Sequence, residues 1–510
     1  MMEIVVGIAV AVVILILYDL TQREHAILRN FPVLGHFRYL FEMVGPELRQ
    51  YIVTSNNEEK PFSRDERSWV YASAKKANNY FGFGTDNDLE KSPNYLIIRQ
   101  AAFPFPTPFK GDPAYSDTYR LPAAKVLGGY RQRAHAFRPK SIVNISAMSF
   151  GSLSSRAVEA MNRGALAAGC LQNTGEGGIS PYHAHGGELI WQIGTGYFGC
   201  RAEDGGFSLE RFLETVDKHN VRAVEIKLSQ GAKPGMGGVL PAAKVTPEIS
   251  KIRGIPLGRD CLSPSSHAAF QDEDGLLDFV ELLADATGLP VGIKSAVGET
   301  LFWKRLAQLM ATSGRAVDFV TVDGGEGGTG AGPLVFADHV ALPFKIGMAE
   351  VYRAFRDQGL DDKVVFIGAG RLGFPEKSLL AFALGCDMVN VAREAMLAVG
   401  CIQAQRCHTG HCPTGVATQS RWLQRGIDVS SKAARLSNYV ISLRKEVLML
   451  SRACGFPHPA LMTPDRLDII DDRLRTRSVA AHFEYEDDWG VPSELDREAI
   501  QAVMAAGGEV

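Results

Sequence analysis

The feature of this sequence that most restricts its fold is the alternation of short apolar runs with helical stretches. From about residue 140, runs rich in Val, Ile and Phe predict strands, and the periodic apolar spacing between them predicts helices. The expected strands are 142–148, 223–228, 290–294, 319–322, 364–367 and 388–391, and the expected helices are 155–168, 276–286, 301–310 and 377–384. This alternation indicates βαβ units and a parallel sheet.

Nearly every expected strand ends in a loop rich in glycine or polar residues. The chain has 52 glycines among 510 residues, and they cluster between about 150 and 420. A doubly wound open sheet would concentrate its Gly-rich loop after the first strand. A (β/α)8 barrel instead builds its active site from the carboxyl ends of all its strands. We therefore predict an α/β fold of the (β/α)8 TIM type.

Charged and amide side chains lie in several of these loops. Glu176 stands among glycines, where its carboxylate can bind a cationic or hydroxyl group or accept loop N–H bonds. Lys227, Gln230 and Lys233 follow one strand, and Arg253 lies further along the chain. Two lysines around a stiff Gly/Pro loop, with an arginine nearby, predict a pocket for a carboxylate or a phosphate.

The loops after the later strands favour a phosphate. Lys294 ends an apolar strand, where a cation needs an anionic partner. Segment 323–333 is the most glycine-dense of the chain, and backbone N–H groups in such loops form nests for anions. Arg371 and Arg393 follow the next two strands, where phosphate binds in a barrel of this type. These loops together predict a phosphorylated cofactor, and flavin mononucleotide (FMN) fits.

Three of the eight cysteines, Cys401, Cys407 and Cys412, fall within twelve residues with the spacing C-x5-C-x4-C. Thiolates on one short loop can ligate an iron–sulfur cluster. They can also bind zinc if His408 or His411 supplies a fourth ligand. Packing as small apolar side chains is less consistent with a loop rich in Gly, Pro and His. The spacing alone does not decide between cluster and zinc.

The N-terminus has a different composition. Residues 4–18 are fifteen consecutive apolar residues, slightly fewer than the roughly 20 that span a bilayer. Glu3 precedes this run, and the basic start and small-residue cleavage site of a signal peptide are missing. Since the run has no polar face, a soluble core helix is less consistent with it. Arg23 and Arg29 follow, so the positive-inside rule predicts a single-pass protein of the cell membrane with a cytoplasmic body.

Charge and cysteine use restrict the partners and the compartment. Fifty-four basic and 57 acidic residues give a net charge of −3. The sequence therefore lacks the excess of basic residues that is typical of proteins that bind nucleic acid. The other five cysteines are scattered, as in a reducing compartment. We divide the chain into an anchor (1–22), an N-terminal extension (23–140), a barrel with its cysteine loop (141–455) and a C-terminal extension (456–510).

Five segments taken together resemble the FMN-binding synthase domain of glutamate synthases. They are SAMSFGS at 146–152, NTGEGG at 173–178, QGAKPG at 230–235, the Gly-rich stretch 324–333, and CHTGHCPTGVATQ at 407–419. The resemblance covers roughly residues 140–455. Segments 31–36 and 61–65 are similar to the short, stand-alone FMN-binding proteins of that family. The resemblance implies a (β/α)8 barrel, FMN and a three-iron cluster.

The implied reaction is reductive amination, in which ammonia adds to 2-oxoglutarate and reduced FMN delivers a hydride. The resemblance places Glu176, Lys233 and Arg253 around the oxo acid and makes Cys401, Cys407 and Cys412 the ligands of a 3Fe-4S cluster. The remaining candidate residues would bind FMN, with Lys294 near the pyrimidine edge of the flavin and Gln230 at its rim. This cofactor-binding set is Ala147, Met148, Ser149, Lys227, Gln230, Lys294, Gly324, Gly325, Gly327, Gly328, Thr329, Gly330, Gly368, Gly370, Arg371, Ala392 and Arg393.

One position departs from the family pattern. Val239 stands where the family usually has a Gln that contacts the oxo acid, so a related oxo acid is an alternative substrate. No glutaminase domain with an N-terminal Cys and no Rossmann fingerprint for NAD(P)H is recognised, so we expect an external ammonia source and an external electron donor, either ferredoxin or a reductase subunit. The alternative function is that of a membrane-tethered flavin and iron–sulfur electron-transfer subunit without synthase activity.

Overall fold

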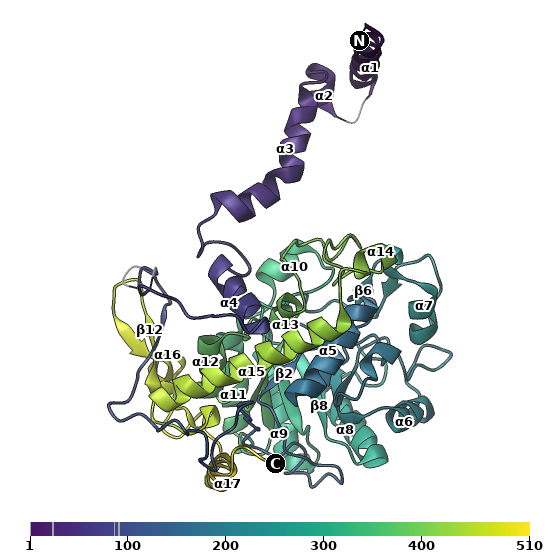
Figure 1. The fold of residues 1–510 in the computed structure, drawn as a ribbon. Coiled ribbons are helices and arrows are strands. Elements are labelled where there is room, and N and C mark those ends of the chain that lie inside the picture. The colour runs from purple at the N-terminus through teal and green to yellow at the C-terminus, as the bar shows by residue number, and fades with distance from the viewer. Residues whose placement is uncertain (1, 23–24, 86, 90–91) are drawn as a thin grey trace. The chain divides into compact units, whose positions relative to one another are not determined.

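Eight parallel strands close into a barrel, as the sequence predicts (Figure 1). The computed structural model describes residues 2–22, 25–85, 87–89 and 92–510. The chain divides into two units, Met1–Trp69 and Val70–Val510, of which the second contains the barrel. In chain order the barrel strands are β2 (Val143–Ile145), β3 (Gln172–Asn173), β4 (Leu189–Ile193), β5 (Val221–Lys227), β8 (Val291–Ala296), β9 (Phe319–Asp323), β10 (Val365–Ala369) and β11 (Met388–Val391).

Six of these strands lie where the sequence predicts them, and β3 and β4 were missed. β3 has only two residues, which is too short to show a pattern. β4 reads LIWQI and is buried throughout, but its Gln192 interrupts the apolar run. The structure shows why a polar residue is accepted there, because the amide of Gln192 donates to buried Glu225 over 2.7 Å.

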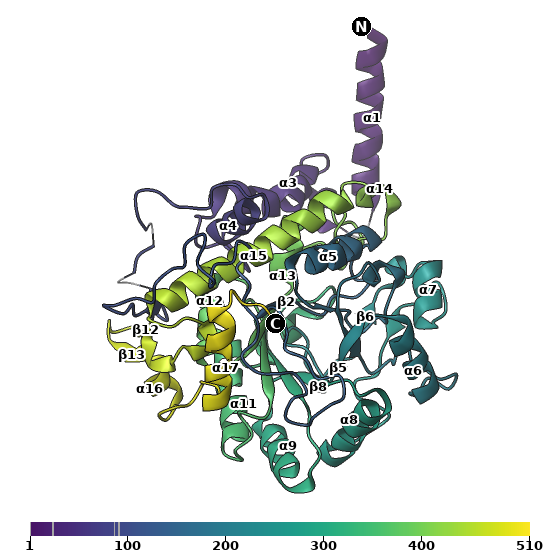
Figure 2. The same cartoon turned by 60° about the horizontal axis from the view of Figure 1, so that its bottom comes forward.

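The helices form an outer layer around the barrel (Figure 2). Several begin with a side-chain cap, such as Ser154, Asp272 and Asp428, whose oxygen accepts an N–H bond from the first turn. The helices of this part of the chain, including shorter ones in the strand-to-helix connections, are α5 (Ser155–Ala168), α6 (Leu209–Lys218), α7 (Pro247–Arg253), α8 (Glu273–Thr287), α9 (Thr300–Ser313), α10 (Leu334–His339), α11 (Phe344–Arg356), α12 (Pro375–Ala383), α13 (Arg393–Ala398), α14 (Arg421–Gln424) and α15 (Val429–Ala453).

The long helix α15 takes the place of the eighth barrel helix and packs along α5 (Figure 2). The two backbones approach closely at Gly164, where an added Cβ would lie 2.9 Å from the carbonyl oxygen of Ala433. Between β11 and α15 the chain forms α13, the cysteine loop and α14. The cysteine loop is therefore an insertion in the eighth strand-to-helix connection, at the carboxyl end of the barrel.

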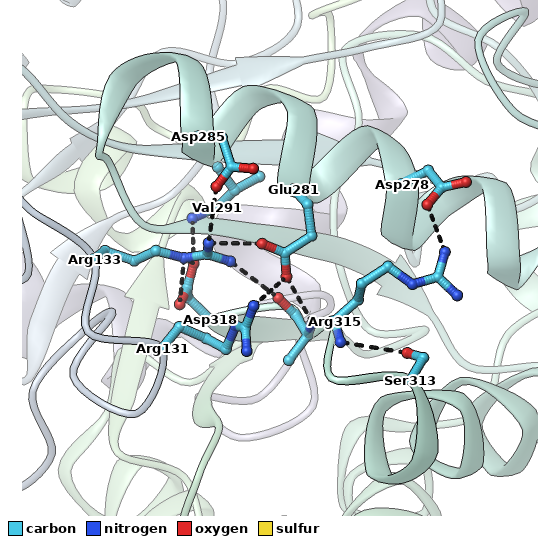
Figure 3. A network of polar contacts seen from close by, with 10 residues as sticks. Arg131, Arg133, Asp278, Glu281, Asp285, Val291, Ser313, Arg315 and Asp318 are labelled. Carbon is cyan, nitrogen blue, oxygen red and sulfur yellow. Dashed lines mark hydrogen bonds and ion pairs between the residues drawn. The ribbon is translucent and has the colours of Figure 1, made fainter.

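The opposite end of the barrel is closed by the chain that precedes β2. Ala123 and Leu127 are buried in one core cluster with strand residues such as Ile190 and Phe319. A network of charged residues joins the same region to β8, β9 and α8 (Figure 3). Arg133 pairs with Asp318 at 3.0 Å and with Glu281 at 2.7 Å. Since charged contacts at this end of a barrel serve stability, we assign the network no catalytic role.

Two small antiparallel sheets stand outside the barrel. One joins β1 (Leu96–Ile98) to β12 (Leu467–Ile470) and β13 (Thr476–Ser478), so segments before and after the barrel pair with each other. The other joins β6 (Val239–Leu240) to β7 (Cys261–Leu262). Helices α16 (Val479–Phe483) and α17 (Glu494–Ala505) follow in the C-terminal segment.

The N-terminal unit is helical. Helix α1 (Met2–Thr21) has a mean hydropathy of 2.7 and is long and apolar enough to cross a membrane. It is followed by α2 (Ala26–Asn30), α3 (Gly35–Leu48), a π-helical turn (Arg49–Val53) and α4 (Arg64–Ala74), which continues into the second unit. The carboxylate of Asp19 in α1 accepts the backbone N–H of Val33 over 2.9 Å and contacts His36 at 3.0 Å. Arg23, part of the predicted positive flank, lies outside the described residues.

Candidate functional site

The loops after β2 and β3 lie against each other at the carboxyl end of the barrel. Gly175 has φ of 67°, and a Cβ there would lie 2.6 Å from the backbone nitrogen of Ser149. The Asn173 side chain fixes this turn by accepting the Gly175 N–H over 3.0 Å. Only glycine satisfies both the backbone angle and the close approach. The small residues of both loops therefore serve to bring Glu176 over the barrel.

Glu176, in the loop after β3, forms an ion pair with Lys227, the last residue of β5. Its Oε1 lies 2.9 Å from Nζ of Lys227, which also donates to the Gln230 side chain over 2.9 Å. Burial alone would raise the pKa of the Glu176 carboxyl, but the cations of Lys227, Lys233 and Arg253 outweigh it and lower that pKa. The carboxylate is therefore ionised at neutral pH.

Lys233 and Arg253 add two further buried cations to this cluster. Burial lowers the pKa of Lys233 to about 8, with a further contribution from Lys227 that Glu176 opposes. Arg253, at the end of α7, donates to the carbonyl of Phe150 over 3.0 Å and to Ser149 Oγ over 3.3 Å. One carboxylate thus faces three cations, and this excess of positive charge suits an anionic ligand.

Lys294 forms an ion pair with Asp323, which is the kind of anionic partner that a cation in an apolar strand needs. Its Nζ lies 3.4 Å from Oδ2 of Asp323, which also accepts the Gly231 N–H over 3.0 Å. Burial disfavours the charged amine, but Asp323 and buried Glu225 prevail and raise the pKa of Lys294. An ammonium that is charged at neutral pH therefore stands in β8, two residues before its carboxyl end.

Buried Glu225 on β5 holds the barrel interior together beneath this ammonium. Its Oε1 accepts bonds of 2.7 Å from both Asn173 and Gln192, and its Oε2 accepts the Thr321 hydroxyl over 2.6 Å. The sequence prediction missed this residue. The available signal was its position, because Glu225 is a carboxylate in a largely apolar strand and such a residue needs buried hydrogen-bond partners.

The Gly-rich loop after β9 packs against the other strand ends. A Cβ on Gly231 would overlap the carbonyl oxygen of Gly324, and one on Gly328 would lie 2.6 Å from the Arg393 side chain. Thr329 accepts a bond of 3.1 Å from the Gln230 amide. The glycines thus allow a close-packed cradle that larger residues would fill.

Two arginines stand at the ends of β10 and β11, as expected. Arg393 donates to the carbonyl of Glu326, and Arg371 adopts a left-handed backbone with φ of 57°. Burial lowers the pKa of Arg393, Glu394 opposes this, and the neighbouring charge of Arg371 adds to the decrease. Two cations close enough to affect each other at the seventh and eighth strand ends suit a phosphate.

The cysteine loop is fastened to the loop after β2. Gln419 donates from its side chain to the carbonyls of Gly151 (3.0 Å) and Leu153 (2.9 Å). None of the eight cysteines, all of which lie within the described residues, forms a disulfide bond. Burial raises the pKa of Cys407, with a further increase from nearby Cys412. Among the described residues, no three Cys, His, Asp or Glu side chains are gathered into a metal site. The loop offers the thiol donors of an iron–sulfur cluster without holding them in a finished geometry.

The predicted residues thus lie in two adjoining groups. Glu176, Lys227, Lys233 and Arg253 form one charged cluster, and Lys294 with the later loops forms the other. The pairing of Lys227 with Glu176 was not predicted, because sequence spacing does not show which charges meet.

Comparisons with known proteins identify the family. A family model described as the conserved region in glutamate synthase matches residues 123–457. The glutamate synthase large subunit-like protein YerD of Bacillus subtilis (strain 168) is 41% identical over 470 residues, covering 86% of this chain and 89% of that protein. An archaeal glutamate synthase (NADPH) of Methanocaldococcus jannaschii is 36% identical over 339 residues, covering 65% of this chain and 62% of that protein.

The coverage differs greatly between relatives. The glutamate synthase (NADPH) large chain of Bacillus subtilis is 31% identical over 320 residues, which are 61% of this chain but only 20% of that protein. The chain therefore matches nearly all of the YerD protein but spans only a part of the glutamate synthases themselves. The family match covers more than half of the chain and includes every barrel strand. The chain belongs to the glutamate synthase family of oxidoreductases.

Proposed function

We propose that this protein is an FMN- and iron–sulfur-dependent oxidoreductase that converts 2-oxoglutarate, or a related oxo acid, to the corresponding amino acid. The observation that carries the proposal is the charged cluster at the barrel mouth, where the carboxylate of Glu176 faces Lys227, Lys233 and Arg253. Family membership supports the reaction class. In the overall reaction an oxo acid, ammonia, two electrons and two protons give an amino acid and water.

The strand ends fit FMN. Lys294 is a buried, charged group of the kind that stabilises an anionic reduced flavin. Arg371 and Arg393 would hold the phosphate, and the close-packed glycines after β9 would let backbone N–H groups approach it. FMN, when bound, would supply the hydride.

The charged cluster would bind and orient the oxo acid. Arg253 and Lys233 are placed to hold carboxylate groups, since both are buried and cationic. Lys233, with a pKa of about 8, could also donate a proton from Nζ to the departing oxygen of the oxo acid. Glu176 is ionised and could hold the ammonium ion or take a proton from the attacking amine.

The cysteine loop would bring electrons one at a time to the same end of the barrel. Cys401, Cys407 and Cys412 would hold a 3Fe-4S cluster, which supplies single-electron transfer when bound. An external donor, either ferredoxin or a reductase subunit, would reduce it. Helix α1 would anchor the protein in the cell membrane, with the barrel in the cytoplasm.

One observation favours a substrate other than 2-oxoglutarate. Val239 begins β6 and follows Gly238, where a Cβ would lie 2.5 Å from Oε1 of Glu176. The backbone beside Val239 therefore passes close to the charged cluster, and the valine side chain supplies no amide donor. The same residue supports the alternative of an electron-transfer subunit that keeps FMN and cluster but lacks synthase activity.

An anaerobic assay separates the two. The purified full-length protein is supplied with reduced viologen or ferredoxin, ammonia and a panel of oxo acids, and amino acids are measured. We expect a flavin absorption spectrum, an iron content that disappears in a variant lacking the three cysteines, and an amino acid from at least one oxo acid. No product from any oxo acid, with normal flavin reduction, would leave the electron-transfer function.

A further inference from the structure

Among the described residues, Lys244 is one of two buried lysines, with Lys233, that form no ion pair with a carboxylate, and Lys233 still faces Glu176. Lys244, in the 3-10 turn Ala242–Lys244, is 2% exposed, and its Nζ donates to the carbonyl of Ser152 over 3.1 Å. By contrast, Lys125, Lys227 and Lys294 are ion-paired with Asp387, Glu176 and Asp323. Among the described residues, no carboxylate forms an ion pair with Lys244. A buried ammonium of this kind is costly unless an anion lies nearby.

Two thiols of the cysteine loop, Cys407 and Cys412, influence the pKa of Lys244. Burial lowers the pKa of Lys244, and the charges of Cys407 and Cys412 act against this decrease. In return, Lys244 opposes the burial that raises the pKa of Cys407. Lys244 therefore lies within electrostatic range of two of the three proposed cluster ligands. Through Ser152 it also contacts the loop after β2, to which Gln419 fastens the cysteine loop.

We propose that Lys244 is a positioning residue whose positive charge retains the anionic iron–sulfur cluster on the cysteine loop and raises its reduction potential. This inference rests on the cluster of the proposed function. Three thiolates give such a cluster a net negative charge, which increases by one unit when it accepts an electron. A nearby buried cation stabilises the reduced form more than the oxidised form, and burial strengthens the effect because water screens it less.

The test is a redox titration of the full-length protein, purified in detergent without oxygen and followed by the electron paramagnetic resonance signal of the oxidised 3Fe-4S cluster. Lys244→Met removes the charge and keeps most of the bulk. At a fixed applied potential we expect its ratio of reduced to oxidised cluster to be at least tenfold below that of the wild type. For a one-electron couple this corresponds to a midpoint lower by about 59 mV.

Two further variants show whether charge is the cause. Lys244→Arg keeps the charge and should restore a midpoint close to the wild-type value. Lys432→Met is a matched control, because this half-buried lysine lies against Gly400, next to Cys401. Its charge is better screened by water, so its removal should shift the midpoint much less.

The possible outcomes are distinguishable. Loss of iron from Lys244→Met with retention in Lys244→Arg supports the proposal, since charge then decides retention. Equal loss of iron from both variants overturns it, because the side chain would then serve packing alone. Retained iron with an unchanged midpoint in Lys244→Met also overturns it. A wild-type protein without iron would instead overturn the cluster in the proposed function.

Discussion

Lys233 is the residue of the charged cluster whose ionisation changes closest to neutral pH. Because burial and Lys227 lower its pKa to about 8, it is charged below pH 7 and increasingly neutral above pH 9. If its ammonium holds a carboxylate of the oxo acid, affinity should be full below pH 7. It should then decrease about tenfold per pH unit above 8. Titration of the flavin spectrum with an oxo acid at several pH values measures this affinity.

Two variants control this prediction. Lys233→Arg stays protonated across the range and should remove the decrease in affinity. Lys251→Arg changes an exposed lysine of α7 and should follow the wild type. An affinity that is constant between pH 7 and pH 9.5 in the wild type would show that Lys233 does not bind the substrate in its charged form.

Single residues also show how far the sequence could predict the site. The residue types of Glu176 and Lys294, and their positions in or after predicted strands, were enough to expect them near the barrel mouth, whereas Arg253 lies at the end of helix α7. Their partners were not predictable, because the Lys227–Glu176 pair joins residues 51 positions apart and depends on how two loops pack. Nothing in the sequence around Lys244 indicated that this lysine is buried. A lone lysine in a short connecting segment is usually a solvated charge, and only the fold shows that this one is buried.

Among the elements, the barrel strands were predicted where an uninterrupted apolar run marks them, and missed where the strand is very short (β3) or where a polar residue interrupts the run (β4, Gln192). β3 has two residues and is specified by its neighbours, since it pairs with β2 on one side and β4 on the other. The pairing of β1 with β12 could not be predicted either, because β1 lies more than 350 residues before β12 in the chain. Such pairings depend on tertiary contacts rather than on local pattern.

The network around Glu225 holds four barrel strands together and gives a prediction at this scale. In Glu225→Leu, the donors of Asn173, Gln192 and Thr321 lose their acceptor inside the barrel. Each buried group left unsatisfied costs about 1–3 kcal/mol, so the free energy of unfolding should fall by at least ~3 kcal/mol. Thermal unfolding followed by circular dichroism measures the loss.

Glu225→Gln is the matched variant, because its amide oxygen can still accept the bonds from Asn173 and Gln192. It should unfold at a temperature much closer to that of the wild type. If Glu225→Leu and Glu225→Gln unfold at the same temperature, the hydrogen bonds do not stabilise the barrel and only the loss of charge beside Lys294 matters.

In the molecule as a whole, the residues that we propose for FMN and for the cluster lie at the carboxyl end of the barrel, and the network around Arg133 lies at the other end. The cysteine loop is inserted after β11, so its contacts with the loop after β2 follow from closure of the barrel, in which β11 and β2 are neighbours. At the opposite end, Arg133 and Asp318 join the preceding segment to β9 (Figure 3). This separation lets the loops vary for chemistry while the other end maintains the fold.

Helix α1 gives a prediction for the whole chain. A membrane span should keep the full-length protein in the membrane pellet after extraction with alkaline carbonate. Val12→Arg places a charge in the middle of α1, which costs about 2.5–3.5 kcal/mol at the bilayer centre, and should release part of the protein. Val12→Leu keeps the helix apolar and should behave as the wild type. Complete release of the wild type by carbonate would show that α1 does not span the membrane.

The orientation of the anchor can be tested separately. Among the described residues that follow α1, the basic side chains of Arg29, Arg38 and Arg49 favour a cytoplasmic location for this flank and for the barrel. A C-terminal green fluorescent protein should then be fluorescent in a bacterial host, and a C-terminal alkaline phosphatase should be inactive. The reverse result would place the barrel outside the cytoplasm. The mass of the purified protein distinguishes an anchor from a signal sequence, since cleavage would remove α1.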